Sequence, residues 1–161
     1  MTDNPFKPPR AHVRDQPPRP GSALRAILTG LTVDIGGSLL SSVVLTILYA
    51  ALLAASGMTE DQVSDAMKNI PPTSIVAILG TVIGACWSVA GGFVCARIVR
   101  RDEYRVGGVM GGLSALLGLM LGGADEPADM LVLLTLTTLA CALLGVKYGR
   151  ALNRRQDGQA R

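Results

Sequence analysis

One carboxylate stands out in this sequence because it adjoins a long apolar run. Asp34 immediately precedes residues 35–55, which contain no Asp, Glu, Lys or Arg. An acid at membrane depth is costly and needs a partner, whereas one at the membrane surface is solvated. We favour a structural role for Asp34, either as a boundary carboxylate or in an ion pair with Lys147. The alternative is that Asp34 couples a proton or cation to transport.

Enzymatic chemistry has little support among the other residues. The only histidine, His12, lies in a proline-rich N-terminal segment, and no GxSxG, HExxH or P-loop motif is present. The acidic group within residues 125–129 is more typical of a solvated loop than of a Ca²⁺ site. We therefore expect no enzymatic activity, no cofactor, no metal site and no nucleic-acid partner.

Four long apolar runs must position Asp34. The chain has 161 residues, of which 49% are apolar and 17% charged, and its mean hydropathy is +0.40. Spanning a membrane takes helices of about 20 apolar residues or a closed barrel, and the runs lack the alternation of barrel strands. The sequence predicts an all-α polytopic membrane protein, a bundle of four transmembrane helices forming two in-out-in hairpins. The runs are 35–55, 74–96, 106–124 and 130–146.

The chain is expected to divide into three parts. Residues 1–22 hold six of the nine prolines and predict a disordered, Pro/Arg-rich cytoplasmic arm. Residues 23–152 form the transmembrane domain, and 153–161 a basic cytoplasmic tail. Before the first apolar run, two structures remain open: one long helix from about Ser22, or an interfacial segment that turns at Gly30.

The distribution of basic residues predicts the orientation. Every Lys and Arg except Lys68 lies in the N-terminal segment, around the loop between the second and third runs, or after the last run. Because cytoplasmic loops are rich in Lys and Arg, both termini should be cytoplasmic and face the anionic lipids of the inner leaflet. In the first outer loop, residues 59–62 match a capping box and predict a short amphipathic helix that caps the bundle or rests on the leaflet.

Small residues spaced four apart form stripes on the predicted helices. Such stripes let helix backbones approach closely in lipid. They indicate packing within one bundle or, through a spare stripe, a homo-oligomer or a larger membrane-protein partner. We interpret Trp87, near the middle of the second run, as a packing residue against a glycine face. The stripe positions are Gly80, Gly84, Ser88, Gly92, Gly107, Gly111, Gly118 and Gly145.

Two short motifs carry a resemblance. The opening Asn4-Pro5-Phe6-Lys7-Pro8-Pro9 resembles the NP[YF]xPP-type opening of small four-span bacterial inner-membrane proteins of uncharacterised function. The stretch 91–98, followed by the glycine-rich 107–112, is similar to a hairpin of such proteins. The resemblance implies a bacterial inner-membrane location and no particular activity.

Two functions follow from these observations. The first is a non-catalytic helix-packing or interaction module in the inner membrane, of unknown biochemical activity, which the small-residue stripes favour. The alternative is a small transporter or channel component that uses Asp34 as a coupling carboxylate. Four-span drug exporters offer a fold-level analogy, but they line their sites with aromatic residues, whereas the apolar runs here contain only Tyr49, Trp87 and Phe93.

Overall fold

The computed structural model describes residues 21–122 and 128–159. Over these ranges the chain forms five helices and no strand. Most of the N-terminal arm, including the motif at residues 4–9, lies outside the described residues, as do 123–127 and 160–161. The helices are α1 (Ala23–Ala55), α2 (Glu60–Lys68), α3 (Ile75–Val99), α4 (Glu103–Gly122) and α5 (Ala128–Gln159).

Four of these helices, α1, α3, α4 and α5, are long and apolar enough to cross a membrane. Each contains most or all of one apolar run, because lipid leaves the backbone no hydrogen-bond partners except those within a helix. The predicted all-α fold with four transmembrane helices is confirmed. The chain is a multi-pass membrane protein.

Helix α1 is continuous over 33 residues, which decides between the two structures left open for its first part. Gly30 does not break it, because this glycine is buried against α3: a Cβ there would lie 2.9 Å from the carbonyl oxygen of Gly91 and 3.1 Å from Cys95 Cβ. Asp34 therefore lies roughly 16 Å along the helix from Ala23, at 1.5 Å per residue. It is an interior residue of a long helix.

Helix α2 covers the end of the hairpin formed by α1 and α3. The backbone N–H of Thr59 donates to Gln62 Oε1 at 3.1 Å, the hydrogen bond expected from the capping box. Met67 and Ile70 line a cavity between α1 and α3. Among the other helices α2 contacts α1 alone, and none of its residues is buried. The two placements considered for this amphipathic helix, on the bundle or on the leaflet, stay predictions.

Helix α5 runs through residues 153–159, where we expected a separate tail, without a break at residue 152. Asn153 is buried, and its Nδ2 donates to the carbonyl oxygen of Ala96 at 3.0 Å. Its Oδ1 accepts from Arg97 Nη1, also at 3.0 Å. The polar residues after 152 therefore extend the α3–α5 contact, because one of them satisfies a backbone carbonyl near the end of α3.

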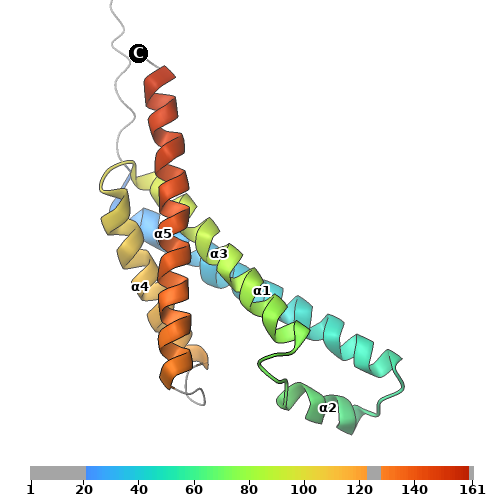
Figure 1. The fold of residues 1–161 in the computed structure, drawn as a ribbon. Helices are drawn as coiled ribbons and strands as arrows, with labels where there is room; N and C mark the ends of the chain where they lie inside the picture. The colour runs from blue at the N-terminus through green and yellow to red at the C-terminus, as the bar shows by residue number, and fades with distance from the viewer. Residues whose placement is uncertain (1–20, 123–127, 160–161) are drawn as a thin grey trace, which may run out of the picture.

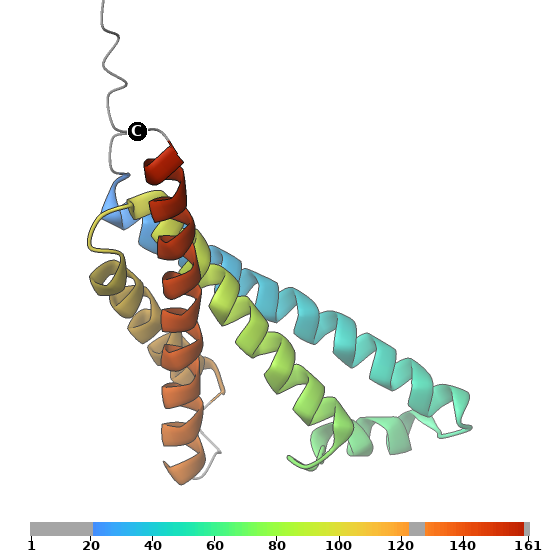
Figure 2. The same cartoon turned by 45° about the horizontal axis from the view of Figure 1, so that its top comes forward.

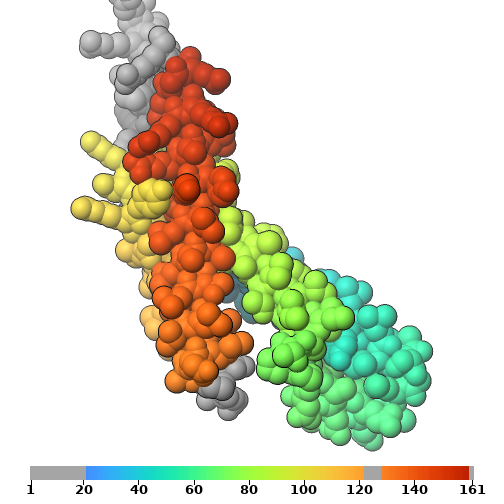
Figure 3. Space-filling model, in the orientation of Figure 1, coloured from blue at the N-terminus to red at the C-terminus, as the bar shows by residue number. Residues whose placement is uncertain are grey.

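The two hairpins form a V (Figure 1). Helix α1 packs along α3 and α4 along α5, while α3 contacts all three of the other long helices; within the described chain α1 and α5 do not touch. Figure 2 shows from a second direction that the hairpins separate toward the α2 end. In the space-filling view the surface is hollowed between the lower parts of α3 and α5 (Figure 3).

Glycines set the closest approach, where α3 meets α5. A Cβ at Gly92 would overlap the carbonyl oxygen of Ala142, and one at Gly145 would overlap that of Val89. Across the α4–α5 contact, a Cβ at Gly107 would overlap the Val146 side chain, and one at Gly111 would lie 3.0 Å from Ala142 Cβ. Only residues without side chains allow these backbones to come so close.

Three other stripe positions do not make such contacts, contrary to the role expected of them. Nothing lies within 4 Å of a Cβ placed at Gly84 or at Gly118, and at Gly80 the nearest atom is Leu45 Cδ2 at 3.7 Å. The reason is the divergence of the hairpins, since a stripe continues along a helix after its neighbour has moved away. The packing prediction made for Trp87 fits the structure, since its ring covers Gly37 of α1.

Gly145→Ile should destabilise the fold far more than Gly84→Ile. The first side chain meets the α3 backbone, and overpacking of this kind costs about 1–3 kcal/mol or more. The second enters open space. Unfolding free energies from titration with dodecyl sulfate in mixed micelles would compare the variants, and equal losses would show that the gap beside Gly84 is closed in the membrane.

Candidate functional site

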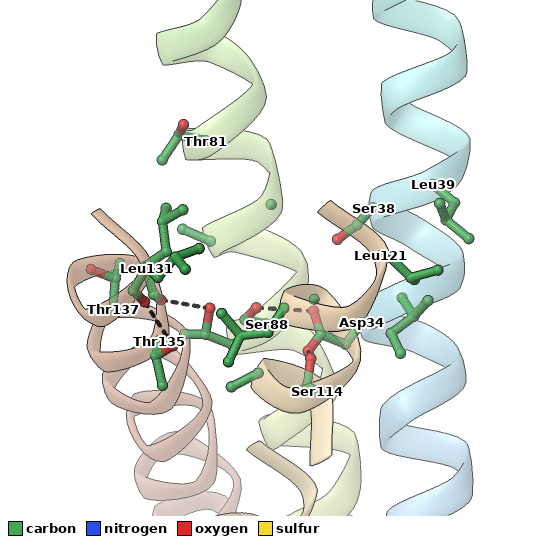
Figure 4. A pocket seen from close by; sticks show the side chains of 18 residues that line it. Asp34, Ser38, Leu39, Thr81, Ser88, Ser114, Leu121, Leu131, Thr135 and Thr137 are labelled. Atoms are coloured by element: carbon green, nitrogen blue, oxygen red, sulfur yellow. Dashed lines mark hydrogen bonds between the residues drawn. The ribbon is translucent and has the colours of Figure 1, made fainter. Parts of the chain in front are cut away.

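Three helices bring polar side chains together around one buried carboxylate (Figure 4). Asp34 of α1 is only 3% exposed, and Ser88 of α3 and Ser114 of α4 are also buried. Ser88 Oγ donates to Asp34 Oδ1 at 2.9 Å, and Ser114 Oγ donates to Oδ2 at 2.5 Å. Each carboxylate oxygen thus has one hydroxyl donor, and each donor comes from a different helix. We call these three residues the Asp34 cluster.

A glycine places the Asp34 cluster at this depth. A Cβ at Gly91, one turn along α3 from Ser88, would lie 3.0 Å from Asp34 Cβ and 2.7 Å from the carbonyl oxygen of Gly30. The absence of that side chain lets α1 approach α3 closely enough for Ser88 Oγ to reach the carboxylate. The same contact buries Asp34 and removes it from solvent.

The ion pair considered between Asp34 and Lys147 is not formed, which corrects that interpretation. Lys147 is exposed, while its neighbours Gly145, Val146 and Gly149 are buried. Its side chain therefore points away from the contacts of α5, and α5 does not touch α1. Within the described ranges the structure contains one ion pair, between Arg150 Nε and Glu103 Oε2 at 3.8 Å.

A cavity of about 420 Å³ extends from the Asp34 cluster into the space between the hairpins. All four long helices line it, with leucines such as Leu39, Leu131 and Leu134 forming apolar walls. The walls also carry hydroxyl groups, among them those of Thr135 and Thr138. Each of these two hydroxyls donates to the carbonyl oxygen four residues earlier, at 2.8 Å for Thr135 and 2.9 Å for Thr138. Their oxygens keep the capacity to accept a hydrogen bond.

Seven of the eight stripe residues named from the sequence fall into three groups. Ser88 belongs to the Asp34 cluster, while Gly92, Gly107, Gly111 and Gly145 pack helices together where the hairpins converge. The open positions Gly84 and Gly118 line the cavity.

Ser114 and Thr138 were not recognised as site residues from the sequence. Ser114 stands four positions before the stripe residue Gly118. A polar hydroxyl at a buried stripe position was the available signal for a hydrogen-bond donor. For Thr138 the sequence contained no signal, because its place depends on the angle between the hairpins.

The site has the chemistry to balance one positive charge. Its ionisable group is a single carboxylate, and within the described part of the chain no group of three or more His, Cys, Asp or Glu side chains gathers to hold a metal ion. Two hydroxyl donors stabilise the carboxylate but do not neutralise it. A proton or a monovalent cation is the complement that fits.

Comparison with protein-family models, curated proteins and solved structures finds no significant match to this chain. The resemblance to small bacterial inner-membrane proteins stays a prediction, and the interpretation of the site depends on its geometry.

Removing one hydroxyl should test whether the Asp34 cluster stabilises the fold. Ser114→Ala leaves Asp34 Oδ2 without its donor and should lower the free energy of unfolding by about 1–3 kcal/mol. Ser64→Ala, on the exposed surface of α2, should change it by less than about 0.5 kcal/mol. If the two variants unfold alike in mixed micelles, the hydrogen bond contributes nothing to stability.

Proposed function

We propose that this multi-pass membrane protein binds and moves a small organic solute carrying one positive charge, with Asp34 as its counter-charge. One observation carries the proposal. Asp34 is a buried carboxylate at the converging end of a cavity, and among the described residues its hydrogen-bond partners are two neutral serines. This observation favours the transport function over the packing module.

The energetics of the buried charge support this assignment. A carboxylate removed from water without a cationic partner carries a penalty of several kcal/mol, which two hydroxyl donors offset only in part. Binding of a proton or of a cationic solute removes the penalty. Because the two would compete for the same oxygens, the Asp34 cluster meets the minimum requirement for exchanging a proton for a solute.

The cavity favours an organic cation over an inorganic ion. Its volume of about 420 Å³ falls within the range of small-molecule sites, roughly 300–1,000 Å³. Its walls are largely apolar, with hydroxyls at a few points, whereas a small metal cation is held by oxygen ligands on all sides. An amine or quaternary ammonium group on an apolar body complements both the carboxylate and the walls.

Binding and movement, rather than catalysis, are proposed because the cavity lining lacks an activated nucleophile. The hydroxyls that line it belong to Ser and Thr, and no His or Lys stands among the lining residues to serve them as a base.

For the location we propose a bacterial inner membrane with both termini in the cytoplasm. The support is the clustering of basic residues at one end of the bundle, where α3 ends, α4 begins and α5 finishes. An anionic leaflet would attract this end. The residues concerned are Arg97, Arg100, Arg101, Arg105, Lys147, Arg150, Arg154 and Arg155.

A second candidate function, the interaction module, keeps one supporting observation. Gly80 and Gly118 are exposed; a Cβ would meet only Leu45 Cδ2, at 3.7 Å, at Gly80 and nothing within 4 Å at Gly118, so each leaves a short face on its helix. A second copy or a larger membrane protein would pack there. The molecular mass of the protein in mild detergent would reveal either partner, whereas a monomer would leave these faces to lipid.

Binding of benzyltrimethylammonium should depend on Asp34. In nanodiscs, Asp34→Asn removes the counter-charge and should weaken binding, measured by calorimetry, at least tenfold, or about 1.4 kcal/mol. Neopentylbenzene, which has the same shape and no charge, should bind the wild type and Asp34→Asn alike. Asp61→Asn, which removes an exposed acid on α2, is the matched control and should bind the cation as the wild type does. Equal cation affinity in wild type and Asp34→Asn would refute the proposal.

A further inference from the structure

A second cavity, of about 360 Å³, lies between α1, α2 and α3. One wall is a row of hydroxyl side chains on α1. The opposite wall is α3, where Ala77, Gly80 and Gly84 leave space beside Val76 and Ile83, and Met67 of α2 closes the far end together with Ile70. The hydroxyl row consists of Ser38, Ser41, Ser42, Thr46 and Tyr49.

The two cavities meet at one point. Ser38 and Gly84 line both of them. Because nothing lies within 4 Å of a Cβ placed at Gly84, the space beside this glycine is unfilled. The hydroxyl row therefore leads from the α2 end of the hairpin to the cavity that holds Asp34.

The hydrogen bonds of these hydroxyls differ from those elsewhere in the membrane helices. Thr32, Thr81 and Thr137 each donate to the carbonyl oxygen four residues earlier, the usual arrangement in an apolar environment. Ser38, Ser42 and Thr46 make no side-chain hydrogen bond to any described residue. Ser41 accepts one from Trp87 Nε1 at 2.9 Å, which leaves its own proton unused.

Ser38 is half-buried and Ser42 and Thr46 are exposed, so water that enters the cavity can form hydrogen bonds with their hydroxyls. A hydroxyl without a hydrogen-bond partner is unfavourable in an apolar medium, and a water molecule needs about 2–4 polar partners to be held. The hydroxyl row offers such partners at successive turns of α1, and the cavity has room for several waters. A hydrated interior satisfies both conditions.

We propose that the second cavity is a water-filled passage through which water and hydronium reach Asp34 from the α2 end. The inference rests on the proposed function, because it gives the carboxylate the proton that competes with the organic cation. Gly84 stands where the passage joins the solute cavity.

Thiol accessibility tests the passage directly. The full chain in lipid vesicles carries Cys86→Ala and Cys141→Ala, while Cys95 is fully buried and is retained. Ser38→Cys should react with a membrane-impermeant, positively charged methanethiosulfonate at least tenfold faster than Leu40→Cys. Leu40 is two residues away, 66% exposed and on neither cavity lining, so its thiol would face lipid.

Filling the gap at Gly84 provides a second measurement. Thr138 lies on α5 and lines the solute cavity alone. In the protein with Gly84 unchanged, Thr138→Cys should react with the methanethiosulfonate. Gly84→Leu should slow that reaction at least tenfold and leave Ser42→Cys unaffected, since Ser42 lies on the far side of the gap. Monodispersity of the Gly84→Leu protein would establish that it is folded, and the comparison of Ser38 with Leu40 does not depend on that variant.

Either of two results would overturn the passage: equal rates for Ser38→Cys and Leu40→Cys, or no effect of Gly84→Leu on Thr138→Cys. Neither measurement requires a bound solute. If the passage fails while benzyltrimethylammonium still binds through Asp34, the proposed function stands with a different proton route. If the passage is found and cation binding does not depend on Asp34, the proposed function fails alone.

Discussion

The architecture depends on the close approach of two helix backbones, α3 and α5, at Gly92 and Gly145. The hydrophobic effect gives lipid-embedded helices little reason to associate, so dispersion contacts between closely spaced backbones must hold them. Those contacts are concentrated near one end of the molecule, and the hairpins separate beyond them. The cavity exists because strong association is confined to the region where the glycines oppose one another.

The Asp34 cluster is a second contact between helices in the same region, and it consists of side-chain hydrogen bonds. Its carboxylate belongs to α1, and its donors belong to α3 and α4, so it spans both hairpins. Glycine contacts specify how near the helices come, whereas hydrogen bonds specify their rotation and register. Together they fix the converging end of the V without constraining the α2 end, where α1 and α3 are covered by α2 alone.

The sequence was sufficient to predict the helices but not their crossing angle. Uncharged runs near 20 residues can only be helices in lipid, and the capping box located α2. The stripe containing Gly84 and Gly92 identified one face of α3 correctly as a continuous row of small residues. Whether another helix packs against that face along its whole length depends on the crossing angle between the helices. The spacing of residues within one helix does not determine that angle.

The same limit explains the Asp34 cluster. An acid beside an apolar run was a reason to expect a partner, and Lys147, directly after the last run, was the basic residue considered. The position of a residue along a helix does not determine the direction of its side chain, however, and Lys147 lies on the exposed face of α5. The end of α5 was missed for a related reason, since the charged residues after 152 gave no sign that Asn153 would be buried.

The placement of Trp87 has a consequence for spectroscopy. This side chain is the only tryptophan in the chain, and it lies between α1 and α3, with its indole over Gly37 and its Nε1 bonded to Ser41. Tyr104 and Tyr148 are on α4 and α5, and Tyr104 stacks beneath the Arg150 guanidinium. Indole emission therefore reports on one hairpin, while two of the three phenols belong to the other, so the unmodified protein already contains separate optical probes for the two legs of the V.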